Sequence, residues 1–348
     1  MVDSRSVMLV CSSPGDGTDS VVSYRFDASN GSVTKSGSSP AENPYYLAIH
    51  PTGEYVYTVD RTAGGLVSAY RIDDPDATLT RLNRRPSGGA GPCYVSIDSY
   101  GNYVYVANYG GGTVSSFPVG SDGRLGVGTT LEFGAEGQDT ASHPHSIAPG
   151  PTGGVVYVPD LGRDRIATLF HRSDGNLDSA SIPDVTLPPG TGPRHFERHP
   201  NGRLLYVVNE IESTLTVFDV RPGTGALRNV ETVSTLPSSF DGENRAADLR
   251  VHPSGRWVYG SNRGHDSIAF FEVDPTSGRL DVQSHVSSGG RTPRTIALDP
   301  TGRYLFAANK DGGGVAVFEL HPETGRPQPR DSVAVPKPMC VRFVPIRG

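Results

Sequence analysis

One strand-turn-strand unit recurs six times along this chain, and such a repeat narrows the folds that the chain can adopt. Two well-matched copies read PRHFERHPNGRLLYVVN from Pro193 and PRTIALDPTGRYLFAAN from Pro293. The other copies start at Pro44, Pro92, Pro144 and Ala246. The glycine that all copies share lies at Gly53, Gly101, Gly153, Gly202, Gly255 and Gly302, with spacings of 48, 52, 49, 53 and 47 residues. A period of about 50 residues indicates a repeat architecture with one supersecondary unit per repeat.

Each copy predicts four antiparallel strands. The first two are joined by a turn such as His-Pro-Thr-Gly, in which proline presets φ and glycine takes the position of positive φ. Two more strands follow, starting at Gly65 and Thr78 in the first copy. Four strands at this period are typical of a propeller blade. One position of each first strand is apolar and is predicted to pack blade against blade. It is occupied by Leu47, Val95, Ile147, Phe196, Leu249 and Ile296.

The two ends of the chain together predict a seventh blade. The segment from Pro338 matches only a first strand, whereas residues 6–37 match a second, third and fourth strand. Pairing of the two segments closes the ring and removes the open sheet edges that invite aggregation. We therefore predict an all-β fold, a seven-bladed β-propeller of four-stranded antiparallel blades. Residues 1–348 form its single domain, and the closing blade combines residues 338–348 and 6–37.

Composition and charge disfavour several classes of partner. The formal net charge is −6 and no basic run occurs, so we expect no nucleic-acid partner. The N-terminal apolar run is too short for a signal peptide, and no segment is long enough to span a membrane. We therefore expect a cytoplasmic protein without a membrane partner. Cys11, Cys93 and Cys340 have no metal-ligand spacing and are expected to be reduced thiols.

Two glycine-rich stretches, residues 110–112 and 312–314, each lie between two predicted strands. A phosphate-binding loop is followed by a helix, so these stretches indicate hairpin turns instead.

The copies differ most at one end of the predicted blades. In an antiparallel pair, the start of the first strand and the end of the second lie at the same end. With the first strand innermost, these positions meet at the mouth of the central channel. Polar and charged residues diverge there from copy to copy, which is typical of a functional site on a regular frame. The candidates are His143, His145, Asp160, Arg194, Glu210, Asp248, Arg263 and Arg294.

The arginines in this set predict an anion site. Arg194, Arg263 and Arg294 carry guanidinium groups, which bind phosphate or carboxylate through paired hydrogen bonds. Asp160 and Asp248 are further candidates for substrate binding. In the alternative interpretation, the arginines pair with these two carboxylates and with Glu210 as a purely structural network.

The histidines divide into two groups. His145 is the best candidate for a general base, with His143 behind it, and Glu210 is either an alternative base or a residue that orients a histidine. His195 follows Arg194 and points to the other side of its strand, so it is predicted to pack between blades. The histidines of the Pro-Gly turns lie at the opposite face and are predicted to be structural. They are His50, His199 and His252.

A metal site built from carboxylates is disfavoured. Asp60, Asp160 and Asp248 are possible ligands, but the neighbouring arginines would oppose a cation. The sequence also lacks the H-E-x-x-H metal pair and the G-x-S-x-G elbow. We predict no metal and no cofactor.

Several longer segments are similar to a known family. SHPHSIAP, TGPRHFERHPNGRLLYVVNE, AADLRVHPSGRWVYGSNRG and TPRTIALDPTGRYLFAAN resemble the seven-bladed propeller lactonases, and the similarity runs from the N-terminal strands to the closing strand. That family includes the bacterial propeller-type 6-phosphogluconolactonase and the fungal carboxy-cis,cis-muconate cyclase. The resemblance implies metal-free lactone chemistry at a channel-mouth site. The residues that match its motifs are His145, Arg194, Glu210, Arg263 and Arg294.

The leading hypothesis is hydrolysis of an anionic small-molecule lactone, 6-phosphogluconolactone, to 6-phosphogluconate by a monomer or weak homo-oligomer. His145 or Glu210 would act as base, Arg263 would stabilise the oxyanion, and Arg194 and Arg294 would hold the phosphate. The alternatives are a cycloisomerase that acts on a carboxylated muconate, a non-catalytic ligand-binding or scaffold propeller, and a metal-dependent sugar lactonase.

Overall fold

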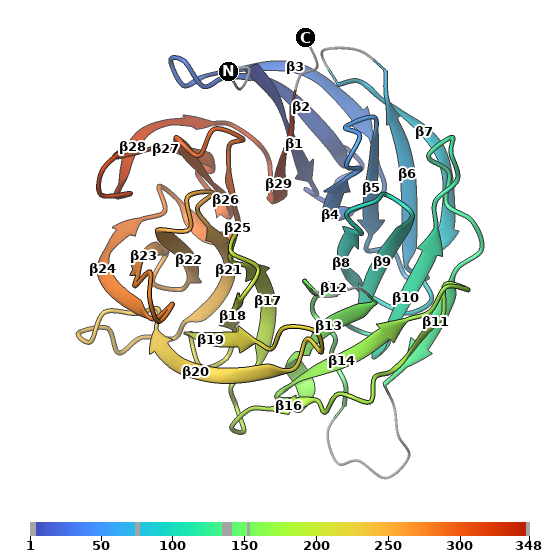
Figure 1. The fold of residues 1–348 in the computed structure, drawn as a ribbon. Coiled ribbons are helices and arrows are strands. Elements are labelled where there is room, and N and C mark those ends of the chain that lie inside the picture. Colours follow the sequence, from blue (N-terminus) through green and yellow to red (C-terminus); the bar gives the residue numbers. More distant parts are fainter. Residues whose placement is uncertain (1–4, 74–76, 134–140, 152–153, 346–348) are drawn as a thin grey trace.

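Seven β-sheets are arranged in a ring in the computed structural model, which describes residues 5–73, 77–133, 141–151 and 154–345 (Figure 1). The axis of such a ring is the central channel of a propeller. The closing sheet has the order β29-β1-β2-β3. Its strands are β29 (Pro338–Pro345), β1 (Arg5–Ser12), β2 (Ser20–Asp27) and β3 (Ser32–Pro40). The sheet therefore joins both ends of the chain, and the predicted seven-bladed propeller with its terminal closure is confirmed. The assignment of all residues, 1–4 and 346–348 included, to one domain stays a prediction.

The other blades follow in chain order, each a meander of antiparallel strands. The next two contain β4 (Pro44–Ile49), β5 (Tyr55–Asp60), β6 (Leu66–Ile72) and β7 (Leu79–Pro86), then β8 (Pro92–Ile97), β9 (Tyr103–Asn108), β10 (Thr113–Pro118) and β11 (Thr129–Glu132). The last three contain β17 (Pro193–Arg198), β18 (Leu204–Asn209), β19 (Thr214–Val220) and β20 (Leu227–Ser234), then β21 (Arg245–Val251), β22 (Trp257–Arg263), β23 (Ser267–Val273) and β24 (Leu280–Ser287), then β25 (Arg291–Leu298), β26 (Tyr304–Gly312), β27 (Gly314–Leu320) and β28 (Pro327–Val333).

The blade between β11 and β17 in chain order departs from this four-stranded pattern. It contains β12 (Ala148–Pro149), β13 (Val155–Asp160), the 3₁₀ turn η1 (Leu161–Arg163), β14 (Arg165–His171), β15 (Leu177–Ser179) and β16 (Val185–Thr186). Both β15 and β16 pair with β14, so the fourth strand is split in two. The first strand is reduced to β12 and an isolated bridge between Pro144 and Asp160. Prolines at 144, 149 and 151 lack the N–H groups that a continuous ladder requires.

The first strands are innermost, as expected. First strands of neighbouring blades contact one another around the channel, for example β4 with β8 and β21 with β25 (Figure 1). The predicted apolar row is buried between the blades. The exposed fractions are 0% for Leu47, 1% for Val95, 0% for Ile147, 8% for Phe196, 0% for Leu249 and 0% for Ile296. Removal of such side chains from water supplies the dominant stabilisation of the ring.

The far face consists of the Pro-Gly turns, and the turn histidines connect neighbouring blades there. Their Nε2 atoms bond to the carbonyl oxygen of the shared glycine in the next turn. The pairs are His50 with Gly101 at 3.2 Å, His199 with Gly255 at 2.8 Å and His252 with Gly302 at 2.8 Å. The predicted structural role of these histidines is confirmed. The shared glycines that are described all have φ between 71° and 79°, and Gly153 lies outside the described residues.

Three smaller predictions concern the glycine-rich stretches, the thiols and membrane spans. Residues 110–112 lie in the connection from β9 to β10, and residues 312–314 lie where β26 turns into β27, so both stretches are hairpin turns as predicted. Cys11 and Cys340 face each other across β1 and β29, and these two thiols and Cys93 are buried and free. Within the described ranges, no helix is long and apolar enough to cross a bilayer.

Candidate functional site at the channel mouth

A bulge at the start of most first strands aims the second residue of the unit at the channel. The strand register shifts between Pro44 and Tyr46, between Pro193 and His195, and again at the start of β8, β21 and β25. The skipped residue leaves the ladder, because a bulge bends the strand and redirects one side chain. In three of the blades that residue is Tyr45, Arg194 or Arg294. The divergent second positions therefore meet at the near mouth, the channel end opposite the Pro-Gly turns.

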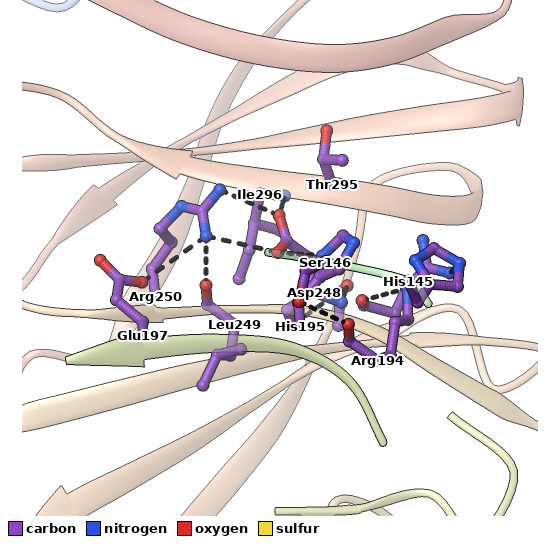
Figure 2. A network of polar contacts seen from close by, with 12 residues as sticks. His145, Ser146, Arg194, His195, Glu197, Asp248, Leu249, Arg250, Thr295 and Ile296 are labelled. Carbon is purple, nitrogen blue, oxygen red and sulfur yellow. Dashed lines mark hydrogen bonds and ion pairs between the residues drawn. The ribbon is translucent and has the colours of Figure 1, made fainter. Parts of the chain in front are cut away.

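Arg194 on β17 is the centre of this site, and its side chain is only 2% exposed. Its Nη1 lies 2.7 Å from Glu210 Oε2 and also donates to His145 Nε2, while its Nε donates to the Ala247 carbonyl at 2.6 Å. Glu210 follows β18 directly, and His145 is held by a 2.9 Å bond from its N–H to the Pro159 carbonyl. Figure 2 shows Arg194 beside His145.

Arg263 at the end of β22 is a second arginine that contacts the Glu210 carboxylate. Its Nη2 lies 3.0 Å from Glu210 Oε2, and His145 Nε2 lies 3.9 Å from the same oxygen. The structure therefore brings together four of the predicted residues, from three blades. We call His145, Arg194, Glu210, Arg263 and the adjacent Arg294 the mouth cluster.

Burial and neighbouring charges together set the protonation states of the mouth cluster. Burial would raise the pKa of Glu210, but the neighbouring Arg194 and Arg263 outweigh it and lower that pKa to about 2. Burial, with Arg194 in second place, lowers the pKa of His145 well below its usual 6.5. At neutral pH the carboxylate is therefore ionised and the imidazole is neutral. Since a guanidinium only donates, His145 Nε2 is the acceptor and its proton lies on Nδ1.

Arg294 contacts a different partner. Its Nη2 donates to the Tyr45 hydroxyl, and Arg61 Nη1 donates to the same hydroxyl at 2.7 Å. Both guanidinium groups also lie over the tyrosine ring, at 4.4 Å for Arg294 and 4.8 Å for Arg61. Burial lowers the pKa of Arg294, and Arg194 lowers it further, which reflects the crowding of positive charge at the mouth.

His143 and Asp160 lie beside the mouth cluster and hold the neighbouring loops in place. The His143 ring stacks on Tyr109 at 4.5 Å, and its Nδ1 contacts the Tyr109 carbonyl. Asp160 is fully buried and accepts hydrogen bonds from the Ser142 hydroxyl and the His143 N–H, both at 2.8 Å. Its oxygens therefore hold the loop that carries His145, and Asp160 does not join the mouth cluster.

Asp248 also points away from the mouth. It is fully buried, accepts from His195 Nδ1 at 2.9 Å and from the Ile296 N–H at 3.1 Å, and pairs with Arg250 at 3.1 Å (Figure 2). Both of its oxygens are engaged, so it is not placed to bind a substrate at the mouth. His195 links two blades through this bond, and its ring lies 5.1 Å from that of His145.

Among the residues that sequence reasoning did not select, Tyr45 and Arg61 lie at the mouth. A signal for both was present in the repeat. Tyr45 occupies the same second position as Arg194 and Arg294, and Arg61 follows β5 as Glu210 follows β18. Cys93, at the equivalent position on β8, is buried with its sulfur 3.4 Å from the His145 carbonyl.

The donor set of this mouth suits an anion. Over the ranges that the structure covers, no group of three or more His, Cys, Asp or Glu side chains is arranged to hold a metal ion. Glu210 is the carboxylate that contacts Arg194 and Arg263. Guanidinium groups in excess of carboxylates favour a ligand with negative charge.

Comparison with known proteins identifies the family of this chain. The model of the family "Lactonase, 7-bladed beta-propeller" matches residues 8–343, so the chain belongs to this family of propeller lactonases. A 6-phosphogluconolactonase of Bacillus subtilis is 34% identical over 289 residues, which are 81% of this chain and 82% of that protein. A 6-phosphogluconolactonase of Serratia proteamaculans is 34% identical over 68% of this chain and 69% of its own length.

One solved structure of similar fold carries an enzyme name that differs from the name of these two relatives. The periplasmic gluconolactonase of Pseudomonas aeruginosa has a TM-score of 0.91 and 30% identity, over 98% of this chain and 99% of that one. Relatives of this chain are thus named for a phosphorylated and for an unphosphorylated lactone.

Proposed function

We propose that this protein is a lactonase that hydrolyses a phosphorylated sugar lactone, 6-phosphogluconolactone, to the open-chain acid. The observation that carries the proposal is the mouth cluster, in which Arg194 and Arg263 share the carboxylate of Glu210 beside the neutral imidazole of His145. Such a set offers a base, an oxyanion site and positive charge for an anionic substrate. The family and the names of its members support the same reaction.

In our proposal, His145 is the base and Glu210 organises the arginines. The carboxylate of Glu210 is a weak base, because two guanidinium groups hold its pKa at about 2. In the complex, the lactone carbonyl oxygen accepts the hydrogen bond that Arg194 otherwise donates to His145. His145 Nε2 is then free to accept a proton. An anionic substrate also offsets the positive charge that weakens this imidazole.

The reaction then proceeds in two steps. Water gives one proton to His145 Nε2, and its oxygen bonds to the carbonyl carbon while Arg194 and Arg263 stabilise the oxyanion. The bond from that carbon to the ring oxygen then breaks, and the imidazolium returns the proton to the ring oxygen. The product is a hydroxy acid. The sequence groups Arg194 with the phosphate, but its bond to His145 favours a place at the carbonyl.

The guanidinium groups supply the positive charge that a Lewis acid would supply, so we propose that the reaction is metal-independent. Release of acid from 6-phosphogluconolactone is measured with and without EDTA, against spontaneous hydrolysis. Equal turnover in both supports the proposal, whereas loss of turnover in EDTA supports a metal-dependent sugar lactonase. The same assay includes a carboxylated muconate, because its carboxylates fit the same arginines. Lactone formation from it would favour the cycloisomerase, and no turnover of either compound would favour a binding role.

A cytoplasmic location of the protein stays a prediction.

A further inference from the structure

A part of the positive charge at the near mouth has no carboxylate partner. Glu210 Oε2 pairs with Arg194 and Arg263. Within the described part of the chain, neither Arg61 nor Arg294 forms an ion pair with an acidic side chain; their shared polar partner is the Tyr45 hydroxyl. The guanidinium groups of the buried Arg294 and the exposed Arg61 repel each other at this one oxygen, and an anion bound between them would offset that repulsion.

Hydrogen-bond donors converge around Tyr45. Its hydroxyl accepts a hydrogen bond from both arginines, so its own hydrogen remains to donate to a third group. The ring lies within 5 Å of both guanidinium carbons, at 4.4 Å for Arg294 and 4.8 Å for Arg61. Cation–π contact keeps the two planar groups beside the ring, with N–H groups left over for an oxyanion.

The arginines around Tyr45 lie across the mouth from His145 and Glu210. Tyr45, Arg61 and Arg294 come from β4, the end of β5 and β25, in the two blades that flank the closing blade. The reacting residues come from the three blades between β12 and β24. Arg294 connects the two sets, because its charge also acts on Glu210 and Arg194. A substrate that spans the mouth therefore places one end at each set.

We propose that Arg61, Tyr45 and Arg294 form a tail subsite for the phosphate of the substrate, and that Arg61 and Tyr45 determine the preference for a phosphorylated over an unphosphorylated lactone. This inference rests on the proposed function for its substrate. It adds two specificity residues outside the group that carries out the chemistry. The relatives named gluconolactonase and 6-phosphogluconolactonase show why such a preference needs a structural basis on this frame.

Two variants test the tail subsite with two substrates. Arg61→Gln and Tyr45→Phe are assayed with 6-phosphogluconolactone and with δ-gluconolactone, which lacks the phosphate. Loss of a charge-assisted bond is expected to lower kcat/KM for the phosphorylated lactone about ten- to hundred-fold, mainly through KM. The value for δ-gluconolactone should change less than about two-fold. Arg221→Gln, an exposed arginine between β19 and β20, is the matched control and should change neither.

Equal losses on both lactones, or no loss on either, would overturn the subsite. If the wild type hydrolyses neither lactone, the proposed function fails, and the subsite is then judged by binding alone. Calorimetric titration with inorganic phosphate and with 6-phosphogluconate should give affinities at least about ten-fold weaker in Arg61→Gln than in the wild type. Unchanged affinities would refute the subsite. Circular dichroism of each variant establishes that the fold is retained.

Discussion

At the near mouth of the channel, two of four guanidinium groups contact the Glu210 carboxylate and the other two share a tyrosine hydroxyl, whereas towards the far end Arg250 contacts two carboxylates. The near group contains Arg61, Arg194, Arg263 and Arg294 with Glu210. At the far end, Arg250 pairs with Asp248 at 3.1 Å and with Glu197 at 3.5 Å, and Arg342 donates to the Tyr46 hydroxyl.

This contrast is the one we expect between the ligand site that we propose and a structural network. Buried charges are stable when they are paired and hydrogen-bonded, and Arg250 meets that condition through Asp248 and Glu197. The near mouth leaves an excess of positive charge, which an anionic ligand can neutralise. Of the structural network expected as an alternative for the near arginines, the structure shows the pairs of Glu210 with Arg194 and Arg263, whereas Asp248 pairs with Arg250. Four changes test this division.

The largest effect is expected at His145 in the near mouth. His145→Gln keeps a polar side chain but removes the proton acceptor, so kcat for lactone hydrolysis should fall about 10²- to 10⁴-fold. The thermal midpoint and KM serve as readouts of folding and binding. His285→Gln on β24, far from the channel, is the matched control and should retain full kcat. A His145→Gln enzyme with wild-type kcat would exclude this residue as the base.

The second effect concerns the far end and acts on stability. Asp248→Asn removes a fully buried charge that pairs with Arg250 and accepts from His195, so the free energy of unfolding should drop by about 3–5 kcal/mol. Where the variant remains folded, kcat/KM should stay within about three-fold of the wild type. Denaturant unfolding gives the first quantity and initial rates give the second. Asp219→Asn breaks a surface pair with Arg228 and should cost less than about 1 kcal/mol. If Asp248→Asn abolished turnover in a stable protein, Asp248 would belong to the site.

A third prediction uses the pH dependence of stability. The folded-state pKa of Glu210 is about 2, below its usual 4.5, so the ionised group stabilises the fold above pH 4.5. That contribution is lost as pH falls from 4.5 towards 2, because the unfolded state then binds the proton first. The difference in unfolding free energy between the wild type and Glu210→Gln should therefore narrow over this window, by up to about 3 kcal/mol. Unfolding curves at several pH values measure it, with Glu212→Gln, an exposed neighbour, as the control. A constant difference would mean that Glu210 is not held ionised by the arginines.

The smallest effect is expected at the far face. His252→Ala removes the 2.8 Å bond to the Gly302 carbonyl in the next blade, which should cost about 1 kcal/mol of stability. Hydrolysis rates should be unchanged, because this turn lies at the opposite end of the channel from His145. A marked loss of kcat would show that the far turns and the near mouth are coupled.

Much of this division could be read from the sequence. The glycine spacing, the apolar row and the incomplete copies at the two termini predicted the number of blades and their closure. The same repeat separated the structural turn histidines from the divergent mouth residues. His145, Arg194, Glu210 and Arg263 were selected because they occupy equivalent strand ends, and the structure places them in direct contact.

The remaining features depend on which side chains meet across blades. The sequence grouped Asp160 and Asp248 with the mouth because their strand positions are equivalent. Their buried oxygens are instead taken by Ser142 and the His143 N–H, and by His195 and Arg250. Equivalent positions predict the end of the blade at which a residue lies, but not the partner that satisfies its charge.

The sequence by itself determined the frame of this protein, because strand alternation and turn chemistry act between residues close along the chain. Tertiary structure alone decided the pairing of charges. Tyr45 bonds to Arg294, 249 residues away in the chain, and this contact exists only after the closing blade brings the two ends of the ring together. Electrostatic partnership depends on distance in space, and ring closure sets that distance.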